Sequence, residues 1–198
     1  MNNINQIDKF PIIILSSPRT GSSLLAELLS KKFPDLKLYL EPDKKDKTIM
    51  DSFTEYSNDN NQYILKLHLK YINNYPKNIA RKIRNHDAFL IKIQRKDIIS
   101  QMTSLYIELI RDIWYYNANQ LETYKEQSIL IDMNMIKLAI YATKQSNTII
   151  ENSRIMYDLE IYYEDLINEL SEELNMIPTP KPINYTEIYQ IIKAEIEK

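Results

Sequence analysis

Short apolar segments alternate along the chain with longer segments in which apolar residues recur every three to four positions. Short continuous apolar segments predict buried strands, whereas the longer spacing predicts amphipathic helices. The expected strands cover residues 11–16, 36–40, 63–69, 88–93 and 158–163. The expected helices cover residues 22–33, 76–85, 97–116, 129–152, 164–175 and 185–197. Strands separated by helices predict an α/β fold with a central parallel sheet of about five strands flanked by helices.

The segment after the first expected strand has the features of a phosphate-binding loop. Residues 12–25 read IIILSSPRTGSSLL, which predicts a buried strand, a tight turn and a helix. The first turn of a helix presents free N–H groups and a partial positive charge, both of which bind phosphate oxygens. Arg19 adds a forked cation, and Ser22 and Ser23 add hydroxyl donors. Gly21 permits backbone angles that other residues resist and allows a ligand to approach closely.

This loop differs from the nucleotide triphosphatase loop, which has the pattern G-x-x-x-x-G-K-[ST]. Here no lysine follows the glycine, and an arginine precedes it by two residues. The sequence Pro-Arg-Thr-Gly-Ser-Ser of Pro18–Ser23 instead resembles the 5'-phosphosulfate loop of the sulfotransferase superfamily. That resemblance implies a P-loop-type three-layer fold and 3'-phosphoadenosine 5'-phosphosulfate as co-substrate, leaving as adenosine 3',5'-bisphosphate. It assigns donor binding to Arg19, Thr20, Gly21, Ser22 and Ser23. The structural alternative is a plain strand-to-helix turn with a surface arginine.

A second segment carries a further resemblance. Residues 88–105 read AFLIKIQRKDIISQMTSL, in which Arg95 closes a strand and Asp97 is a candidate helix N-cap. The pattern Arg-x-Asp-x-x-x-Gln-x-x-Ser resembles the bacterial glycolipid (trehalose-type) branch of the superfamily. In this family such an arginine and a serine of the following helix hold the 3'-phosphate, which implies that role for Arg95 and Ser104.

The position of the hydroxyl is ambiguous between two neighbours. In many members of the family the hydroxyl lies eight residues after the arginine, which selects Thr103 rather than Ser104. The two side chains point about 100° apart around a helix. Ser104 shares the expected polar side of the helix with Ser100, Gln101 and Glu108, so we expect Ser104 to bind the phosphate.

Two residues are candidates for a catalytic base. His68 ends the third expected strand in the sequence Lys-Leu-His-Leu of residues 66–69, similar to the Lys-Thr-His-Leu element of cytosolic sulfotransferases. That resemblance implies His68 as the base and Lys66 as the cation that assists the leaving group. Glu41 follows the second expected strand, where a glutamate is the base in the glycolipid branch. A buried histidine and a solvated carboxylate are the structural alternatives; we favour His68 slightly.

Together these resemblances imply a sulfotransferase that moves a sulfuryl group in line to a hydroxyl or amine of a small-molecule, glycan or lipid acceptor. Arg19 would neutralise the charge that builds on the leaving phosphate. This chemistry needs no metal, and no metal-ligand cluster is visible in the sequence. Two alternatives stay open: an atypical P-loop small-molecule or nucleoside kinase, and a catalytically inactive nucleotide-binding module. The kinase is disfavoured because no lysine follows Gly21.

The C-terminal part has weaker features. Residues 160–166, EIYYEDL, resemble the Tyr-Glu-Asp-Leu strand-to-helix junction of the superfamily, and we expect an acidic first turn that stabilises its helix. Cytosolic sulfotransferases end in a glycine-rich basic loop on the 3'-phosphate. That loop is excluded here because Gly21 is the only glycine, so Lys181 and Asn184–Tyr185 are candidates to replace it.

Composition sets the remaining expectations. A length of 198 residues with 44% hydrophobic and 26% charged residues predicts a globular protein with one domain over residues 1–198. A net charge of −2 argues against a general nucleic-acid binder, and the absence of cysteine excludes disulfides, Cys-ligated zinc and thiol nucleophiles. Residues 1–10 are polar and mixed in charge, and no apolar run nearby could span a bilayer, so we expect a cytoplasmic protein.

Overall fold

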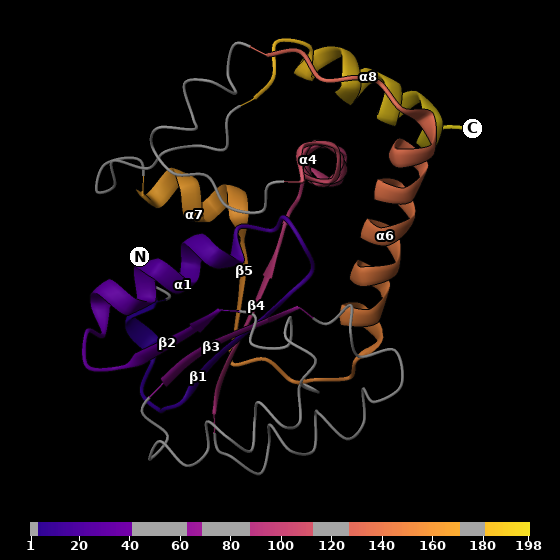
Figure 1. Cartoon of the computed structure of the whole chain (residues 1–198). Helices are drawn as coiled ribbons and strands as arrows, with labels where there is room; N and C mark the ends of the chain where they lie inside the picture. The colour runs from indigo at the N-terminus through magenta and orange to yellow at the C-terminus, as the bar shows by residue number, and fades with distance from the viewer. Residues whose placement is uncertain (1–3, 41–62, 69–87, 113–126, 171–180) are drawn as a thin grey trace. The chain divides into compact units, whose positions relative to one another are not determined.

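The structure is a computed structural model that describes residues 4–40, 63–68, 88–112, 127–170 and 181–198 (Figure 1). Four of the expected elements are affected by these limits. The helix predicted over residues 76–85 lies outside the described residues, as do the ends of the strand predicted over 63–69 and of the helices predicted over 97–116 and 164–175. Along the chain the elements are η1 (Ile4–Gln6), β1 (Ile12–Ser16), α1 (Ser22–Lys32), β2 (Lys37–Leu40), β3 (Tyr63–His68), β4 (Phe89–Gln94), α4 (Ile98–Arg111), α6 (Met133–Asn152), β5 (Leu159–Tyr162), α7 (Tyr163–Leu170) and α8 (Tyr185–Ile196).

The internal contacts divide the chain into two compact units. The first consists of Met1–Lys96 and Ser146–Glu169, and the second of Asp97–Gln145 and Leu170–Lys198. The expectation of a single domain stays a prediction. Among the described helices, none is both long enough and apolar enough to cross a membrane.

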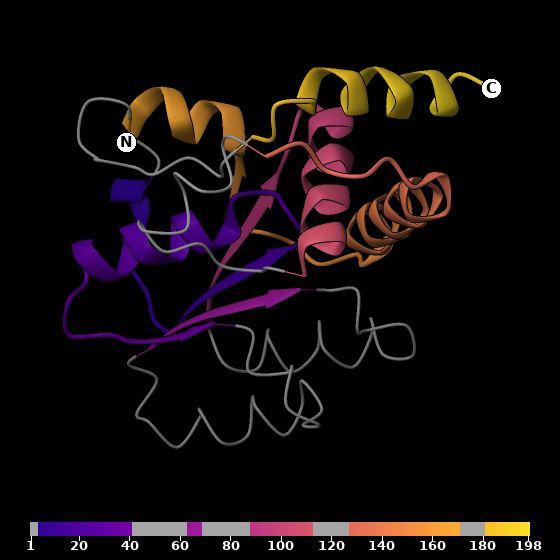
Figure 2. The same ribbon diagram turned by 45° about the horizontal axis from the view of Figure 1, so that its top comes forward.

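The first unit is built on a five-stranded sheet in the order β2-β3-β1-β4-β5, in which every neighbouring pair is parallel (Figures 1 and 2). The predicted α/β class, with about five parallel strands flanked by helices, is therefore confirmed. β1 lies at the centre of the sheet and all five of its residues are buried. Its continuous run of isoleucine and leucine follows from this position, because a central parallel strand is covered on both faces.

Helical segments pack on the two faces of this sheet. On one face Ile13 and Leu15 of β1 share an apolar cluster with Ile150, from the last turn of α6. Side chains alternate between the faces of a strand, so Ile14 and Ser16 point to the opposite face. That opposite face is the one that α1 covers, because Lys66, the register partner of Ile14, bonds to a serine of α1.

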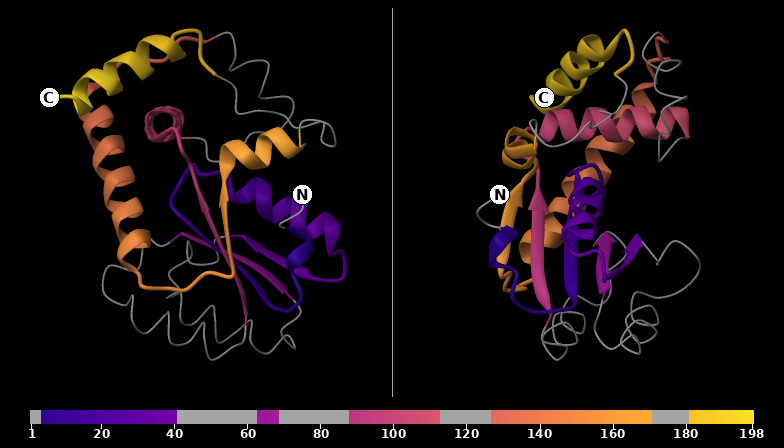
Figure 3. Two further views of the ribbon diagram at one scale, coloured as in Figure 1. Left: turned by 180° about the vertical axis from the view of Figure 1, so that it is seen from behind. Right: turned by 90° about the vertical axis from the view of Figure 1, so that its left-hand side faces the viewer.

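The second unit is helical. α4, α8 and the first turns of α6 share one apolar cluster, and α8 lies against α4 (Figure 3). α4 begins as the sequence predicts: Oδ1 of Asp97 accepts a hydrogen bond of 2.9 Å from the backbone N–H of Ser100, the geometry of an N-cap.

α6 begins at Met133, four residues later than the sequence pattern predicts. The preceding residues 129–132 lie outside the helix and are held by side chains. The hydroxyl of Tyr106 donates to the carbonyl of Leu130 and accepts from the N–H of Asp132. Asp132 in turn accepts from the first N–H groups of the helix, at 2.8 Å from Asn134. A side-chain cap of this kind fixes the start of the helix, which the apolar spacing alone would place four residues earlier.

Candidate functional site

The loop between β1 and α1 is a tight turn closed by its own side chains. Oγ1 of Thr20 donates to the carbonyl of Ser17 at 3.0 Å, and Oγ of Ser17 donates to Oδ1 of Asn147 at 2.5 Å. Arg19 and Gly21 both have left-handed backbone angles, with φ of 63° and 82°. The hydroxyl of Thr20 therefore stabilises the turn. Nothing in the sequence pattern points to Asn147, which approaches from the distant helix α6.

α1 starts directly from this turn. Gly21 is its N-cap, and the carbonyl of Gly21 accepts the first helical hydrogen bond, of 3.1 Å, from Leu25. The N–H groups of the first turn have no partner within a helix, and Gly21 has no side chain that could cap them. Ser22 is buried, while Ser23 is half-buried. The local geometry is therefore that of an anion-binding helix start.

Gly21 is required here for a reason that the sequence did not reveal. A Cβ atom at this position would lie 2.3 Å from Cδ2 of Tyr163, in addition to the unfavourable φ of 82°. The sequence argument attributed the glycine to a turn and to the approach of a ligand. In the structure the group that approaches the backbone of Gly21 is the ring of Tyr163.

The end of β3 faces the same helix. Lys66 has only 2% of its surface exposed, and its Nζ donates to Oγ of Ser23 at 2.7 Å. His68 lies two residues further along the strand, so its side chain points to the same face, and it is 7% exposed. Its register partner on β1 is Ser16, whose hydroxyl is buried and, among the described residues, has no hydrogen-bond partner. The other candidate base, Glu41, lies outside the described residues.

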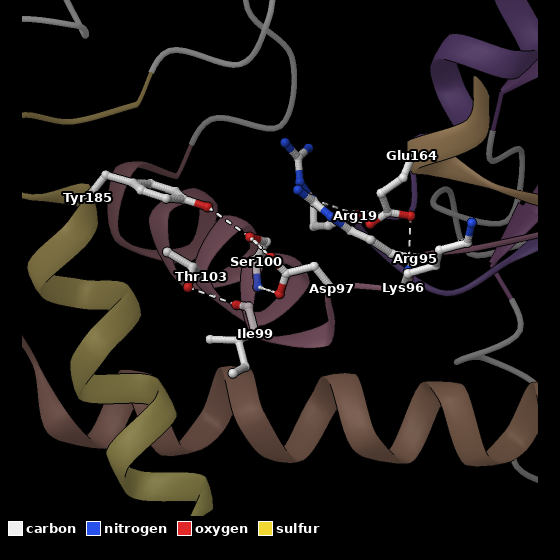
Figure 4. A network of polar contacts seen from close by, with 9 residues as sticks. All are labelled: Arg19, Arg95, Lys96, Asp97, Ile99, Ser100, Thr103, Glu164 and Tyr185. Carbon is white, nitrogen blue, oxygen red and sulfur yellow. Dashed lines mark hydrogen bonds and ion pairs between the residues drawn. The ribbon is translucent and has the colours of Figure 1, made fainter. Parts of the chain in front are cut away.

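Arg95 follows the last residue of β4, which lies on the other side of β1 from β3, and its side chain reaches the loop (Figure 4). Its Nη1 donates to the carbonyl of Arg19 at 3.4 Å, and its Nε lies 3.8 Å from Oε1 of Glu164. The guanidinium carbon lies 4.7 Å from the centre of the Tyr163 ring. Of its five N–H donors, only the one to Arg19 makes a hydrogen bond within the described residues, which leaves Arg95 able to bind an anion.

The first turn of α7 holds the segment around Arg95 in place. Oε2 of Glu164 accepts from the N–H of Lys96 at 3.0 Å (Figure 4). Asp165 accepts from the Lys96 ammonium at 2.6 Å. The hydrogen bond to Asp165 raises the pKa of Lys96 above its ordinary value. The sequence suggested only an acidic turn that stabilises its own helix. The signal in the sequence that could have indicated these contacts is the Tyr-Glu-Asp-Leu pattern itself, which contains both carboxylates.

The second unit contains the two alternative hydroxyls of α4. Thr103 is fully buried, and its Oγ1 donates to the carbonyl of Ile99 at 2.8 Å (Figure 4). Ser104 is half-buried. The expected polar side was wrong in part, because Gln101 and Glu108 are buried. The donor hydrogen of Thr103 is used within the helix, and the choice of Ser104 as a phosphate ligand stays a prediction from the sequence.

The residues suggested to replace the glycine-rich loop make contacts within this unit. The side-chain amide of Asn184 accepts from the N–H of Ile129 at 3.1 Å and donates to its carbonyl at 2.9 Å. The ammonium of Lys181 lies 4.5 Å from the centre of the Tyr185 ring, and the Tyr185 hydroxyl donates to Oγ of Ser100 at 3.4 Å (Figure 4). Asn184 therefore has a structural role in fixing the segment before α6.

Comparisons with known proteins find similar solved structures but no matching sequence. No family model matches the chain, and no curated protein matches it. Among solved structures, the chain is similar to mouse sulfotransferase SULT7A1, crystallised in complex with PAP. The TM-score is 0.42 and the sequence identity 16%, over 100% of this chain and 70% of that one.

Proposed function

We propose that the protein is a sulfotransferase that uses 3'-phosphoadenosine 5'-phosphosulfate. The observation that carries this proposal is the hydrogen bond of 2.7 Å from the buried ammonium of Lys66 to Ser23. In addition to Arg19 in the loop, Lys66 supplies a buried cation at the first turn of α1. A buried cation beside free helix N–H groups stabilises the negative charge that develops on a leaving phosphate.

Each end of the donor has a matching group. The loop N–H groups, Arg19 and the hydroxyls of Ser22 and Ser23 would hold the 5'-phosphosulfate. Arg95 would hold the 3'-phosphate, a role for which the sequence resemblance also nominates Ser104. The hydrogen bond of 3.4 Å from Arg95 to the carbonyl of Arg19 supports the assignment of Arg95, since it brings this cation to the loop that would hold the 5'-phosphosulfate.

The proposed reaction is a single in-line displacement. An acceptor oxygen or nitrogen forms a bond to sulfur, and the bond from sulfur to the 5'-phosphate oxygen breaks, so adenosine 3',5'-bisphosphate leaves. The proton of the acceptor passes to a base. We assign the base to His68, because it lies two residues after Lys66 on the same face of β3 and beside Ser16 in register. Glu41 is the rival that the experiment below includes.

The acceptor is proposed only as a class: a hydroxyl or amine of a small molecule, glycan or lipid, as in the glycolipid branch that the segment from Arg95 to Ser104 resembles. The polar composition of the described helices is compatible with a cytoplasmic enzyme, which is the location we propose.

Calorimetry with adenosine 3',5'-bisphosphate, ATP and GTP, with and without magnesium, tests the proposal. We expect the bisphosphate to bind more tightly than ATP and GTP, and to need no magnesium for binding. In an acceptor screen with labelled donor we then expect sulfuryl transfer. Preference for ATP with magnesium would refute the proposal. The turnover rates of His68→Ala and Glu41→Gln identify the base, because a residue whose substitution leaves the turnover rate unchanged is not the base.

A matched pair of lysines tests the carrying observation. Lys66→Met should lower the transfer rate by about 100- to 1,000-fold, the range typical of losing one group that stabilises charge in the transition state. Lys92 is the control, because it is also a strand lysine but lies on the other face, paired with Glu160 at 3.1 Å. Lys92→Met should leave the rate unchanged, and equal losses in both variants would show that Lys66 acts only through the fold.

A further inference from the structure

The ring of Tyr163 touches both parts of the chain that would bind the donor. Tyr163 is the first residue of α7, and the preceding residue, Tyr162, pairs in register with Gln94 at the end of β4. The next residue along from Gln94 is Arg95, whose guanidinium carbon lies 4.7 Å from the centre of the Tyr163 ring. On the other side, a Cβ atom at Gly21 would lie 2.3 Å from Cδ2 of that ring.

The contact with Arg95 is a cation–π contact, in which the guanidinium carbon lies over the Tyr163 ring. A guanidinium donates its hydrogen bonds in its own plane, whereas stacking over an aromatic ring uses its flat face. Within the described residues the one hydrogen bond from Arg95 goes to the carbonyl of Arg19. Tyr163 therefore contacts the guanidinium of Arg95 without making a hydrogen bond with it.

We propose that Tyr163 is a positioning residue that sets the spacing and orientation of Arg95 relative to the loop of Arg19–Ser23. The proposal rests on the proposed function, in which the loop holds the 5'-phosphate and Arg95 the 3'-phosphate. A ligand with both phosphates depends on the spacing of the two sites, because it must engage both at once. A ligand with the 5'-phosphate alone engages only the loop and depends on that spacing less.

The test compares two ligands by calorimetry: adenosine 3',5'-bisphosphate and adenosine 5'-monophosphate. In Tyr163→Leu, which lacks a planar ring, the bisphosphate should bind about tenfold more weakly, since a partly desolvated cation–π contact is worth about one factor of ten. The monophosphate should lose less than about threefold on the same scale. Tyr163→Phe keeps the ring and should bring the bisphosphate affinity back to within about twofold of wild type.

Tyr162 provides a matched control. Its ring lies 5.0 Å from the ammonium of Lys96, so Tyr162→Leu removes a neighbouring cation–π contact of the same kind that does not involve the loop. This variant should bind both ligands as wild type does. Circular dichroism of each variant verifies that the protein is folded under the conditions of the titration.

The outcomes separate this proposal from the proposed function. Equal losses for both ligands in Tyr163→Leu, or a Tyr163→Phe variant as weak as Tyr163→Leu, would overturn the positioning role. A wild-type protein that does not bind the bisphosphate refutes the proposed function instead. In that case the positioning role is tested by the loss of stability that Gly21→Ala causes. If the ring contacts the loop, this loss must be smaller in a Tyr163→Ala background than in wild type. An equal loss in both backgrounds overturns the proposal.

Discussion

Replacing Gly21 by alanine tests how the loop is built, and two separate costs can be worked out from the structure. The first is conformational: a φ of 82° is left-handed, which costs an L-residue with a Cβ atom about 1–2 kcal/mol. The second is steric. The new Cβ would lie 2.3 Å from Cδ2 and 2.9 Å from Cε2 of Tyr163, well inside the contact distance of roughly 3.5–4.0 Å between carbon atoms.

The Tyr163 ring or the loop must therefore shift by more than an ångström. Insertion of one methyl group into a well-packed site costs about 1–3 kcal/mol. The two terms together predict a loss of about 2–5 kcal/mol, a large part of the roughly 5–15 kcal/mol that stabilises a typical domain. Because the loop N–H groups would move with the backbone, binding of adenosine 3',5'-bisphosphate should weaken in the same variant.

Urea unfolding followed by circular dichroism measures the stability term, and a comparison of substitutions separates its two parts. Asparagine tolerates left-handed angles better than alanine but also carries a Cβ atom, so Gly21→Asn retains mainly the steric cost. Removing the ring in Gly21→Ala/Tyr163→Ala retains mainly the conformational cost. A Gly21→Ala variant less than about 1 kcal/mol below wild type would refute the reasoning, since the backbone term alone exceeds that value.

Two further predictions concern other parts of the chain. Asp97→Ala removes the acceptor of the 2.9 Å bond from Ser100 and should cost about 1 kcal/mol of stability, whereas Asp97→Asn keeps an acceptor and should cost less; equal losses in urea unfolding would contradict the capping role. Burial raises the pKa of Tyr157 above its ordinary value of 10.0. The folded protein then keeps this proton while the unfolded chain loses it, so stability that is present below about pH 10 falls as the pH rises further. Tyr157→Phe should show a smaller fall between neutral pH and about pH 11, and an unchanged fall would assign the effect to other groups.

The class of the fold was predictable because it depends on local patterns. Five short apolar segments became five parallel strands, and Asp97 begins α4 as its position before an amphipathic segment predicts. The start of α6 was not predictable, because the residues before it are fixed by Tyr106 and Asn184, which are distant in sequence. Apolar periodicity carries no information about such long-range side-chain bonds.

The same division holds at the candidate site. The turn around Arg19 and Gly21 has a local sequence pattern, and its geometry agrees with that pattern. The contacts that connect the turn to Lys66, Arg95 and Tyr163 join residues from four different segments, and only the tertiary fold brings them together. Sequence reasoning could nominate Lys66 and Arg95 from the motifs that contain them, but it could not give Tyr163 a role without knowing which backbone its ring covers.

The left-handed angle of Arg19 implies a conflict between stability and activity. An arginine at a φ of 63° holds a conformation that glycine would adopt without strain. Selection for thermal stability alone would therefore favour glycine at position 19, and would remove the cation that faces the proposed donor. A stabilised form of the protein should be sought through substitutions elsewhere in the chain, since the strained residue of the loop is also the one that carries its charge.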